Sequence, residues 1–216
     1  MSKRKEKPVS EMKPTGWYYS FLYHTVGHIV RFMCNIHVKN PENEPKDLTG
    51  VLIIANHRVW CDPIYMGLAL KRLQPHFMAK KESFNFPPLA LLIRALGAYP
   101  VNRGGADVGA IRRTIEMLKH GIPVGMFPQG HRYPDVDART TSVKTGAAMI
   151  AIKAGVPVMP IFIKVKDNHM HWFCRKELIF GELITPEEMN YNPEAPGEYQ
   201  RVADYLFEKV CELGDD

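Results

Sequence analysis

The sequence predicts an α/β fold: a single domain with a mixed, mostly parallel sheet flanked by helices, preceded by an N-terminal membrane-interface helix. Its 216 residues are enough for one sizeable core and too few for two ordinary domains with a linker. Short apolar runs alternate with stretches of helical period, which is typical of helices that cover a largely parallel sheet. The balance of 45% hydrophobic and 24% charged residues is that of a folded protein rather than a disordered one.

The N-terminal part divides into two segments. Residues 1–14 are basic and nearly free of large apolar side chains, so we expect a flexible tail there. Residues 15–33 are rich in aromatic side chains, and as a helix they place His24, His28 and Arg31 on one face. A spanning helix needs about 20 mostly apolar residues, which this segment lacks. It is therefore expected to lie in the headgroup region of a membrane, or alternatively to pack on the domain as an ordinary amphipathic helix.

The main domain, residues 34–216, contains seven candidate strands separated by helical patterns. The clearest helix spans residues 105–121, where Val108, Ile111, Ile115 and Leu118 recur at helical spacing and Gly121 supplies a stop. The strand candidates are short apolar runs at residues 35–39, 50–55, 76–79, 98–101, 123–127, 156–165 and 178–183.

Charge and cysteine content narrow the classes of partner. The net charge of +5 favours an anionic partner, either a nucleic acid, a phosphorylated small molecule or an acidic lipid surface. Nucleic acid is disfavoured because the basic residues are dispersed and no binding motif accompanies them. Cys34, Cys61, Cys174 and Cys211 have neither CxxC nor metal-like spacing, so we expect reduced thiols, no metal and no cofactor. No secretory leader is recognisable, and the domain is expected to face the cytoplasm.

The run NHRVWCDP follows the strand at residues 50–55 and contains a histidine and an aspartate. His57 and Asp62 do not share one face of a regular helix, so they can meet only across a turn. Asp62 before Pro63 is typical of an N-cap and first helical position. A carboxylate that holds one ring nitrogen leaves the other as a base. Alternatively, Asp62 only caps the helix and His57 is an incidental loop residue, and the pair alone does not decide.

Four segments at strand ends occur in a fixed order, and together they resemble the glycerolipid acyltransferase family, which includes the bacterial 1-acyl-sn-glycerol-3-phosphate acyltransferases. The segments are NHRVWCDP, YPVNR, FPQGHR and the valine-proline strand AGVPVMP. The matched residues are His57, Asp62, Arg103, Phe127, Pro128, Gly130, Arg132, Val156, Pro157 and Pro160. Two positions depart from the family pattern: Gln129 replaces the usual Glu, and Trp60 replaces a small residue beside the pair.

The resemblance implies a role for each matched position. His57 would take the proton of the acceptor hydroxyl as it attacks an acyl thioester, and Asp62 would orient the imidazole. Arg103 and Arg132 would hold the acceptor phosphate, with Lys80 of the AKKES stretch as a third cation. Gln129 and Gly130 would complete the substrate site, which leaves the exact acceptor open because Gln129 lacks the usual charge.

As a whole, the resemblance implies that residues 34–216 form an acyltransferase catalytic domain. It would transfer a fatty acyl group from acyl-CoA or acyl-carrier protein to the sn-2 hydroxyl of 1-acyl-sn-glycerol 3-phosphate, forming phosphatidate. The expected place is an anionic membrane surface, the cytoplasmic face of the cell membrane, with peripheral or monotopic attachment. The alternatives are a different lysophospholipid acceptor and a non-catalytic lipid-binding protein of the same fold.

Cys61 lies between the two residues of the pair and permits a second mechanism. A cysteine nucleophile with a histidine base could form an acyl-enzyme. The family resemblance assigns no such role, and free cysteine is commonly buried as a small apolar side chain. We therefore expect Cys61 to be a packing residue.

Overall fold

A seven-stranded sheet forms the centre of the computed structural model, which describes residues 8–13, 16–46, 50–102, 107–165 and 174–215. The strand order is β1-β7-β6-β2-β5-β3-β4. The central strands from β6 to β4 are parallel, β7 runs antiparallel to β6, and β1 is parallel to β7. The strands are β1 Ile36–Lys39, β2 Leu52–Ala55, β3 His76–Lys80, β4 Tyr99–Val101, β5 Val124–Met126, β6 Val158–Val165 and β7 Lys176–Phe180.

Each of the seven predicted runs overlaps a strand, and the mixed, mostly parallel sheet is confirmed. The seventh was predicted at residues 178–183, but it begins two residues earlier and ends at Phe180. Its antiparallel pairing with β6, from Ile161 opposite Phe180 to Val165 opposite Lys176, determines these limits. An apolar run alone does not reveal where its partner strand ends.

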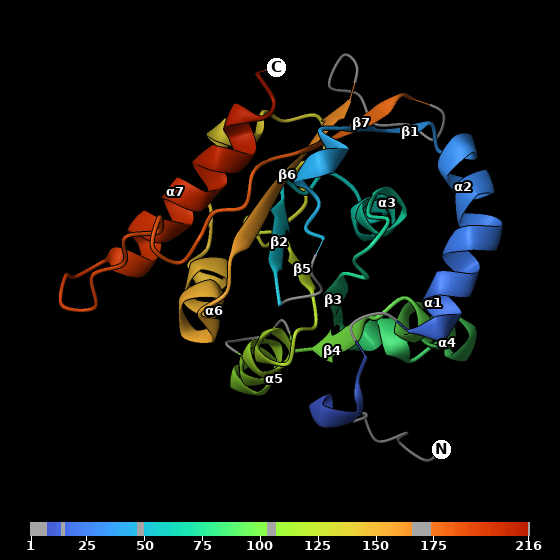
Figure 1. Cartoon of the computed structure of the whole chain (residues 1–216), viewed down its shortest axis with the longest axis horizontal. Coiled ribbons are helices and arrows are strands. Elements are labelled where there is room, and N and C mark those ends of the chain that lie inside the picture. Colours follow the sequence, from blue (N-terminus) through green and yellow to red (C-terminus); the bar gives the residue numbers. More distant parts are fainter. Residues whose placement is uncertain (1–7, 14–15, 47–49, 103–106, 166–173, 216) are drawn as a thin grey trace.

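Helices cover both faces of the sheet (Figure 1). Alternate residues of β2 belong to two separate cores: Leu52 and Ile54 pack with α5, α6 and α7, whereas Ile53 and Ala55 pack with α3. Burial on both faces explains why β2 is apolar throughout. The helices of the domain are α3 Asp62–Ala69, α4 Pro87–Ala95, α5 Val108–Lys119, α6 Gly146–Ala154 and α7 Glu198–Glu212, with short turns η1 Val9–Glu11, η3 Pro41–Asn43, η4 Lys81–Phe84 and η5 Ala138–Thr140.

Helix α5 lies within the predicted segment, and its predicted apolar stripe faces the core except at the first residue of the helix. Asp107 is its N-cap, and the Asp107 side chain accepts a hydrogen bond from the backbone N–H of Ala110 at 3.0 Å. The buried residues are Ala110, Thr114, Met117 and Leu118, whereas Val108 is exposed. Of the predicted stripe, Leu118 is buried and Ile111 and Ile115 are partly buried against the same core, so only Val108 departs from the prediction. Small residues such as Ala110 also face the core, although they carry little weight in a hydrophobic pattern.

The predicted N-terminal helix is present as α1 Trp17–Leu22, the π-helical turn η2 Tyr23–Gly27 and α2 His28–Met33. It packs on α3, because the Tyr19 hydroxyl donates to the carbonyl oxygen of Gly67 at 2.7 Å and Gly27 lies against Leu68. Its other faces leave large apolar side chains exposed: Trp17, Phe21, Val26, Ile29, Phe32 and Met33. No helix among the described residues is long and apolar enough to cross a membrane.

The predicted tail, residues 1–14, is only partly described, because residues 1–7 and 14 lie outside the described residues. Of residues 8–13, Pro8, Ser10, Glu11 and Lys13 are exposed, and the other two contact the domain. Val9 is 4% exposed and joins the core beside α5, with Met12 partly buried against it. Val9 and Met12 are thus the two points at which this short piece of chain contacts the domain.

Candidate functional site

The carboxyl ends of four parallel strands meet at one edge of the sheet, where ligands bind in folds of this kind. His57 follows β2, the FPQGHR segment follows β5, and Lys80 ends β3. Arg103, which follows β4, lies outside the described residues. The predicted site residues that are described therefore come from neighbouring strand ends.

Asn56 determines where the chain leaves the sheet. Its side chain is buried, its amide oxygen accepts from the backbone N–H of Ile163 at 2.7 Å, and its amide nitrogen donates to the carbonyl oxygen of Ile163 at 3.2 Å. Both bonds continue the pairing of β2 with β6 beyond Ala55, so the loop that begins at His57 starts from a fixed position.

The histidine and the aspartate of the first block are in contact. Nδ1 of His57 lies 2.7 Å from Oδ2 of Asp62, and the side chains are 11% and 0% exposed. The same carboxylate oxygen accepts the backbone N–H groups of Arg58 at 2.6 Å and Val59 at 2.8 Å. These charge-assisted bonds hold the carboxylate in place, and Nε2 of His57 is the ring nitrogen that Asp62 leaves unengaged.

The predicted N-cap role of Asp62 is wrong by one position. Asp62 is the first residue of α3, and the N-cap is Cys61, whose carbonyl oxygen accepts the N–H groups of Ile64 and Tyr65. The Asp62 carboxylate points back to the loop, where it bonds the N–H groups before the helix rather than those within it. The carboxylate therefore stabilises the loop before α3 and does not cap the helix.

The His57 ring is also packed from the side. It stacks on Phe127 with ring centroids 4.1 Å apart and an interplanar angle of 16°, and Phe77 stacks against Phe127 at 5.9 Å. The backbone N–H of Tyr133 donates to the carbonyl oxygen of His57 at 2.9 Å. The segment after β5 therefore contacts both the ring and the backbone of His57.

Gln129, predicted to bind substrate, is 2% exposed and uses its amide inside the protein. Its Oε1 accepts the backbone N–H of His57 at 2.6 Å, and its Nε2 donates to Oγ1 of Thr141 at 2.6 Å. Gly130 follows with a φ of +69°, a left-handed conformation that favours glycine. Gly130 shapes the turn that brings Gln129 under the histidine.

Lys144 is a site residue that the sequence interpretation missed. Its backbone N–H donates to the carbonyl oxygen of Pro128 at 2.9 Å, and its side chain crosses the face of Gly130. A Cβ atom at Gly130 would lie 2.9 Å from Cδ and 3.2 Å from Nζ of Lys144. Within the described residues, its ammonium group has no ion pair. The pattern VKTG before α6 carries no strong motif, so only the fold reveals this proximity.

The predicted phosphate cations are exposed at the same edge. Arg132 lies in the turn after Gly130, on the solvent side. Nζ of Lys80 lies 3.9 Å from Oε2 of Glu82, with both side chains more than half exposed, so this ion pair is weak. Both charges are accessible to a ligand.

Cys61 is buried, as the packing interpretation predicts. Burial raises the pKa of its thiol, and the Tyr65 hydroxyl and the Lys176 ammonium oppose this only in part. A raised pKa keeps the sulfur protonated and weakly nucleophilic. Trp60, in contrast, is 62% exposed and extends from the same loop into solvent.

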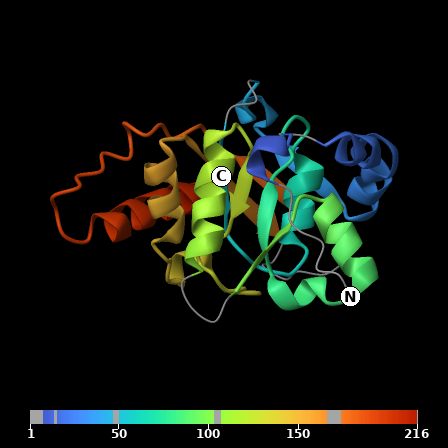
Figure 2. The same cartoon turned by 90° about the horizontal axis from the view of Figure 1, so that it is seen from below.

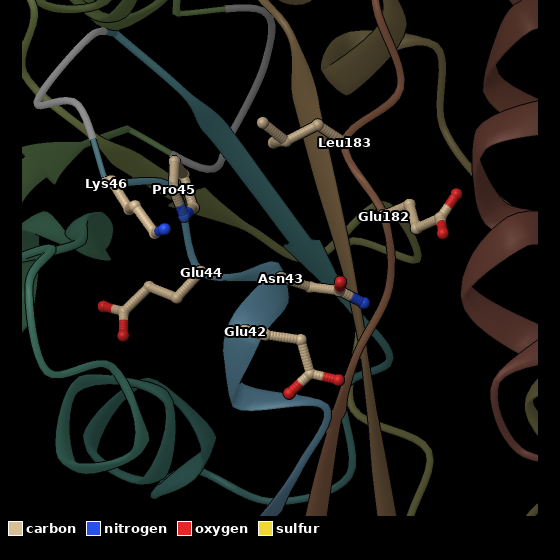
Figure 3. A pocket seen from close by; sticks show the side chains of 7 residues that line it. All are labelled: Glu42, Asn43, Glu44, Pro45, Lys46, Glu182 and Leu183. Atoms are coloured by element: carbon tan, nitrogen blue, oxygen red, sulfur yellow. The ribbon is translucent and has the colours of Figure 1, made fainter.

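A hollow of about 450 Å³, lined by none of these site residues, lies between η3 and the segment after β7 (Figure 3). Its carboxylates include Glu42, Glu182 and Glu44. The Glu44 carboxylate accepts the backbone N–H groups of residues 71–73 after α3, so it has a structural role. Among the described residues, no group of three side chains could hold a metal ion. We therefore place the candidate active site at His57.

The chain belongs to the acyltransferase family, whose sequence profile, described as "Acyltransferase", matches residues 35–164. It is 38% identical over 128 residues to the 1-acyl-sn-glycerol-3-phosphate acyltransferase of Streptococcus pneumoniae, covering 59% of this chain and 46% of that relative. It is 29% identical over 177 residues to the enzyme of the same name from Bacillus subtilis, covering 81% and 86%.

The fold is similar to that of a solved structure. The crystal structure of the 1-acyl-sn-glycerophosphate acyltransferase PlsC from Thermotoga maritima superposes with a TM-score of 0.67 at 25% sequence identity, covering 95% of this chain and 85% of that one. The chain spans less than half of the streptococcal relative, so the similarity concerns the shared domain.

Proposed function

We propose that this chain transfers a fatty acyl group from a thioester donor, acyl-CoA or acyl-carrier protein, to the sn-2 hydroxyl of 1-acyl-sn-glycerol 3-phosphate, forming phosphatidate. The observation that carries the proposal is the 2.7 Å contact between His57 and the fully buried Asp62 carboxylate at the sheet edge. The names of the relatives support the choice of acceptor. A binding module alone would have no need of an oriented base.

In the proposed reaction, Nε2 of His57 takes the proton of the acceptor hydroxyl while the oxygen attacks the thioester carbonyl. Asp62 stabilises the imidazolium that forms, because its carboxylate is held beside Nδ1. The tetrahedral intermediate then releases the thiolate, which recovers the proton from His57. The acyl group passes directly to the acceptor, and no enzyme nucleophile takes part.

The acceptor phosphate is proposed to bind the exposed cations at this edge. Arg132 offers a planar guanidinium that suits two parallel bonds to phosphate, and Lys144 adds an ammonium group above Gly130. Arg103 and Lys80, from the ends of β4 and β3, are proposed to complete the cluster.

We also propose peripheral or monotopic attachment to the cytoplasmic face of the cell membrane. The apolar side chains exposed on α1 and α2 have a neighbour in α4, which lies beside α1 in both views (Figure 1, Figure 2) and exposes Leu91 and Leu92. His24 and His28 are exposed on the same N-terminal helix, and basic groups favour an anionic surface. A lysolipid acceptor would be reached from that surface.

Flotation with anionic vesicles tests the attachment. Deleting residues 1–33 should weaken it, but this removes Tyr19 from its contact with α3, so point changes are cleaner. Phe21→Ser with Phe32→Ser should reduce flotation and activity on vesicle-borne lysolipid, with little effect on a short-chain soluble acceptor. Thr25→Ala, on the same exposed helix, is the control. Undiminished flotation of the folded double variant would contradict the attachment through this helix.

The activity itself is tested by thioester consumption with a panel of lysolipids and both donors. We expect the highest rate with 1-acyl-sn-glycerol 3-phosphate, and phosphatidate as the product identified by mass spectrometry. A higher rate with another lysolipid would mean that this lysolipid is the acceptor, while the proposed acyl transfer would still hold. Absence of turnover with every acceptor and donor would contradict the enzymatic proposal.

A further inference from the structure

We propose that Gln129 is a positioning residue, which fastens the backbone of His57 to the turn after η5 and makes no contact with the acceptor. This inference refines the proposed acyl transfer and rests on it. The side chain occupies the place where the family pattern has a glutamate, and that pattern implies a substrate contact. Burial and hydrogen bonding in this chain support a different role.

The first observation is that both ends of the amide are already bonded within the protein. Oε1 lies 2.6 Å from the backbone nitrogen of His57, and Nε2 lies 2.6 Å from Oγ1 of Thr141. With 2% of the residue exposed, an acceptor molecule would have to displace these bonds to reach it. A buried amide that lost them would be costly.

The second observation concerns what the bonds hold. The N–H of His57 donates to Gln129 and its carbonyl oxygen accepts from the N–H of Tyr133, so the segment after β5 binds both backbone polar groups of His57. Asp62 and Phe127 hold the ring of the same residue. Because the ring is attached to this backbone, a shift of the peptide would move Nε2 relative to the acceptor hydroxyl.

The third observation explains why an amide suits this chain. The His57 N–H can only donate, so an oxygen must face it. The Thr141 hydroxyl donates to the carbonyl oxygen of Ala138 at 2.6 Å, so a donor must face Thr141. Glutamine satisfies both ends. An ionised glutamate would satisfy only the first unless Thr141 turned its hydroxyl away from Ala138, and it would add a buried charge.

Three variants test the proposal. Gln129→Met removes both bonds at nearly constant volume, Gln129→Glu keeps an acceptor for the His57 N–H, and Thr141→Val loosens the far end while leaving Gln129 itself intact. Thr114→Val is the matched control, because Thr114 is a fully buried threonine on α5 whose hydroxyl bonds Ala110 and Tyr99. Each protein is assayed with the lysolipid that the wild type consumes fastest, with kcat and the acceptor KM determined separately.

We expect Gln129→Met to lower kcat on the order of 10- to 100-fold with the acceptor KM within about twofold of wild type. Gln129→Glu should recover part of this loss, and Thr141→Val should lie between wild type and Gln129→Met. Thr114→Val should lower stability without lowering kcat. A raised acceptor KM with kcat retained in Gln129→Met, or an unchanged kcat in Thr141→Val, would overturn the proposal.

Hydrogen exchange of the His57 amide gives a readout that does not depend on turnover. In the wild type this N–H should be protected, and Gln129→Met should exchange it at least about tenfold faster, whereas Thr114→Val should not. If the wild type consumed none of the lysolipids, the proposed function would fail while this measurement still decided the role of Gln129. Unchanged protection in Gln129→Met would refute the positioning role.

Discussion

Replacing Asp62 by asparagine tests the central contact of the site. In the wild type, three donors converge on Oδ2: the His57 ring and the backbone N–H groups of Arg58 and Val59. Asparagine must keep its oxygen there, because its NH₂ group would meet donors. The variant therefore retains the geometry of the loop but loses the negative charge that stabilises a protonated His57.

The magnitudes follow from these three bonds. A hydrogen bond to a charged group contributes about 1.5–3 kcal/mol and a neutral one about 0.5–1.5 kcal/mol, so the substitution weakens each bond by about 1 kcal/mol. The weakening of these three bonds alone should lower the free energy of unfolding by about 3 kcal/mol, which for a chain of this size lowers Tm by roughly 6–12 °C. Without the carboxylate, kcat should fall by about 10²–10⁴-fold.

Thiol release from the acyl donor and thermal melting, measured on the same samples below Tm, separate the two effects. The matched control is Glu44→Gln, because Glu44 is also a buried carboxylate that accepts three backbone N–H groups, those of Lys71, Arg72 and Leu73. It should lose stability comparably and retain kcat. His57→Ala should lose turnover while remaining folded. Near wild-type turnover in either Asp62→Asn or His57→Ala would refute the general-base assignment.

Three further predictions concern other residues. Cys61→Ala should retain turnover, because burial keeps the pKa of the thiol raised, and trapping of an acyl-protein that this variant lacks would contradict direct transfer. Arg132→Ala and Lys144→Ala should each raise the acceptor KM about 10- to 100-fold, because each removes one charged contact of about 1.5–3 kcal/mol. Lys153→Ala on α6 is the control and should leave the acceptor KM unchanged. A rise in the donor KM alone would show that these cations bind the donor instead. Burial lowers the pKa of His76 below 6.5, so the unfolded chain binds the proton first, and stability present above about pH 6.5 is lost as the pH falls. Melting of His76→Gln between about pH 7 and pH 5 should show a smaller decrease, and an unchanged slope would exclude His76 as the cause.

The strands and the contact between His57 and Asp62 could be predicted from the sequence because both depend on local patterns. A central parallel strand such as β2 is apolar throughout, and His57 directly follows it, which places the histidine at the carboxyl edge whatever the details of the loop. Asp62 could be paired with His57 because only a turn separates them. Its helix position was wrong by one residue, since the N-cap at Cys61 depends on backbone angles that residue preferences resolve poorly.

The contacts of Gln129 and Lys144 could not be predicted, because each is made across a turn. Thr141 lies 12 residues after Gln129, and no periodic pattern links the two. Lys144 reaches Gly130 only because the glycine has no side chain and a φ of +69°. The family pattern implies a substrate contact at position 129 because it records which residue types recur there. It does not record whether the side chain points to the ligand or to the protein.

Burial divides the candidate site into two parts with different physical tasks. His57, Asp62 and Gln129 are nearly inaccessible, and each of them is held by at least two bonds or stacking contacts. Arg132, Lys80 and Lys144 are exposed on the solvent side.

A base must keep its nitrogen within hydrogen-bond reach of one hydroxyl, and the rigid environment serves that need. Cations that capture a phosphate and later release the product gain from solvent access, because deep burial would make unpaired charges too costly. Substitutions of the buried group should therefore act mainly on kcat and those of the exposed group mainly on the acceptor KM, and a reversal of the two classes would show that this division is wrong.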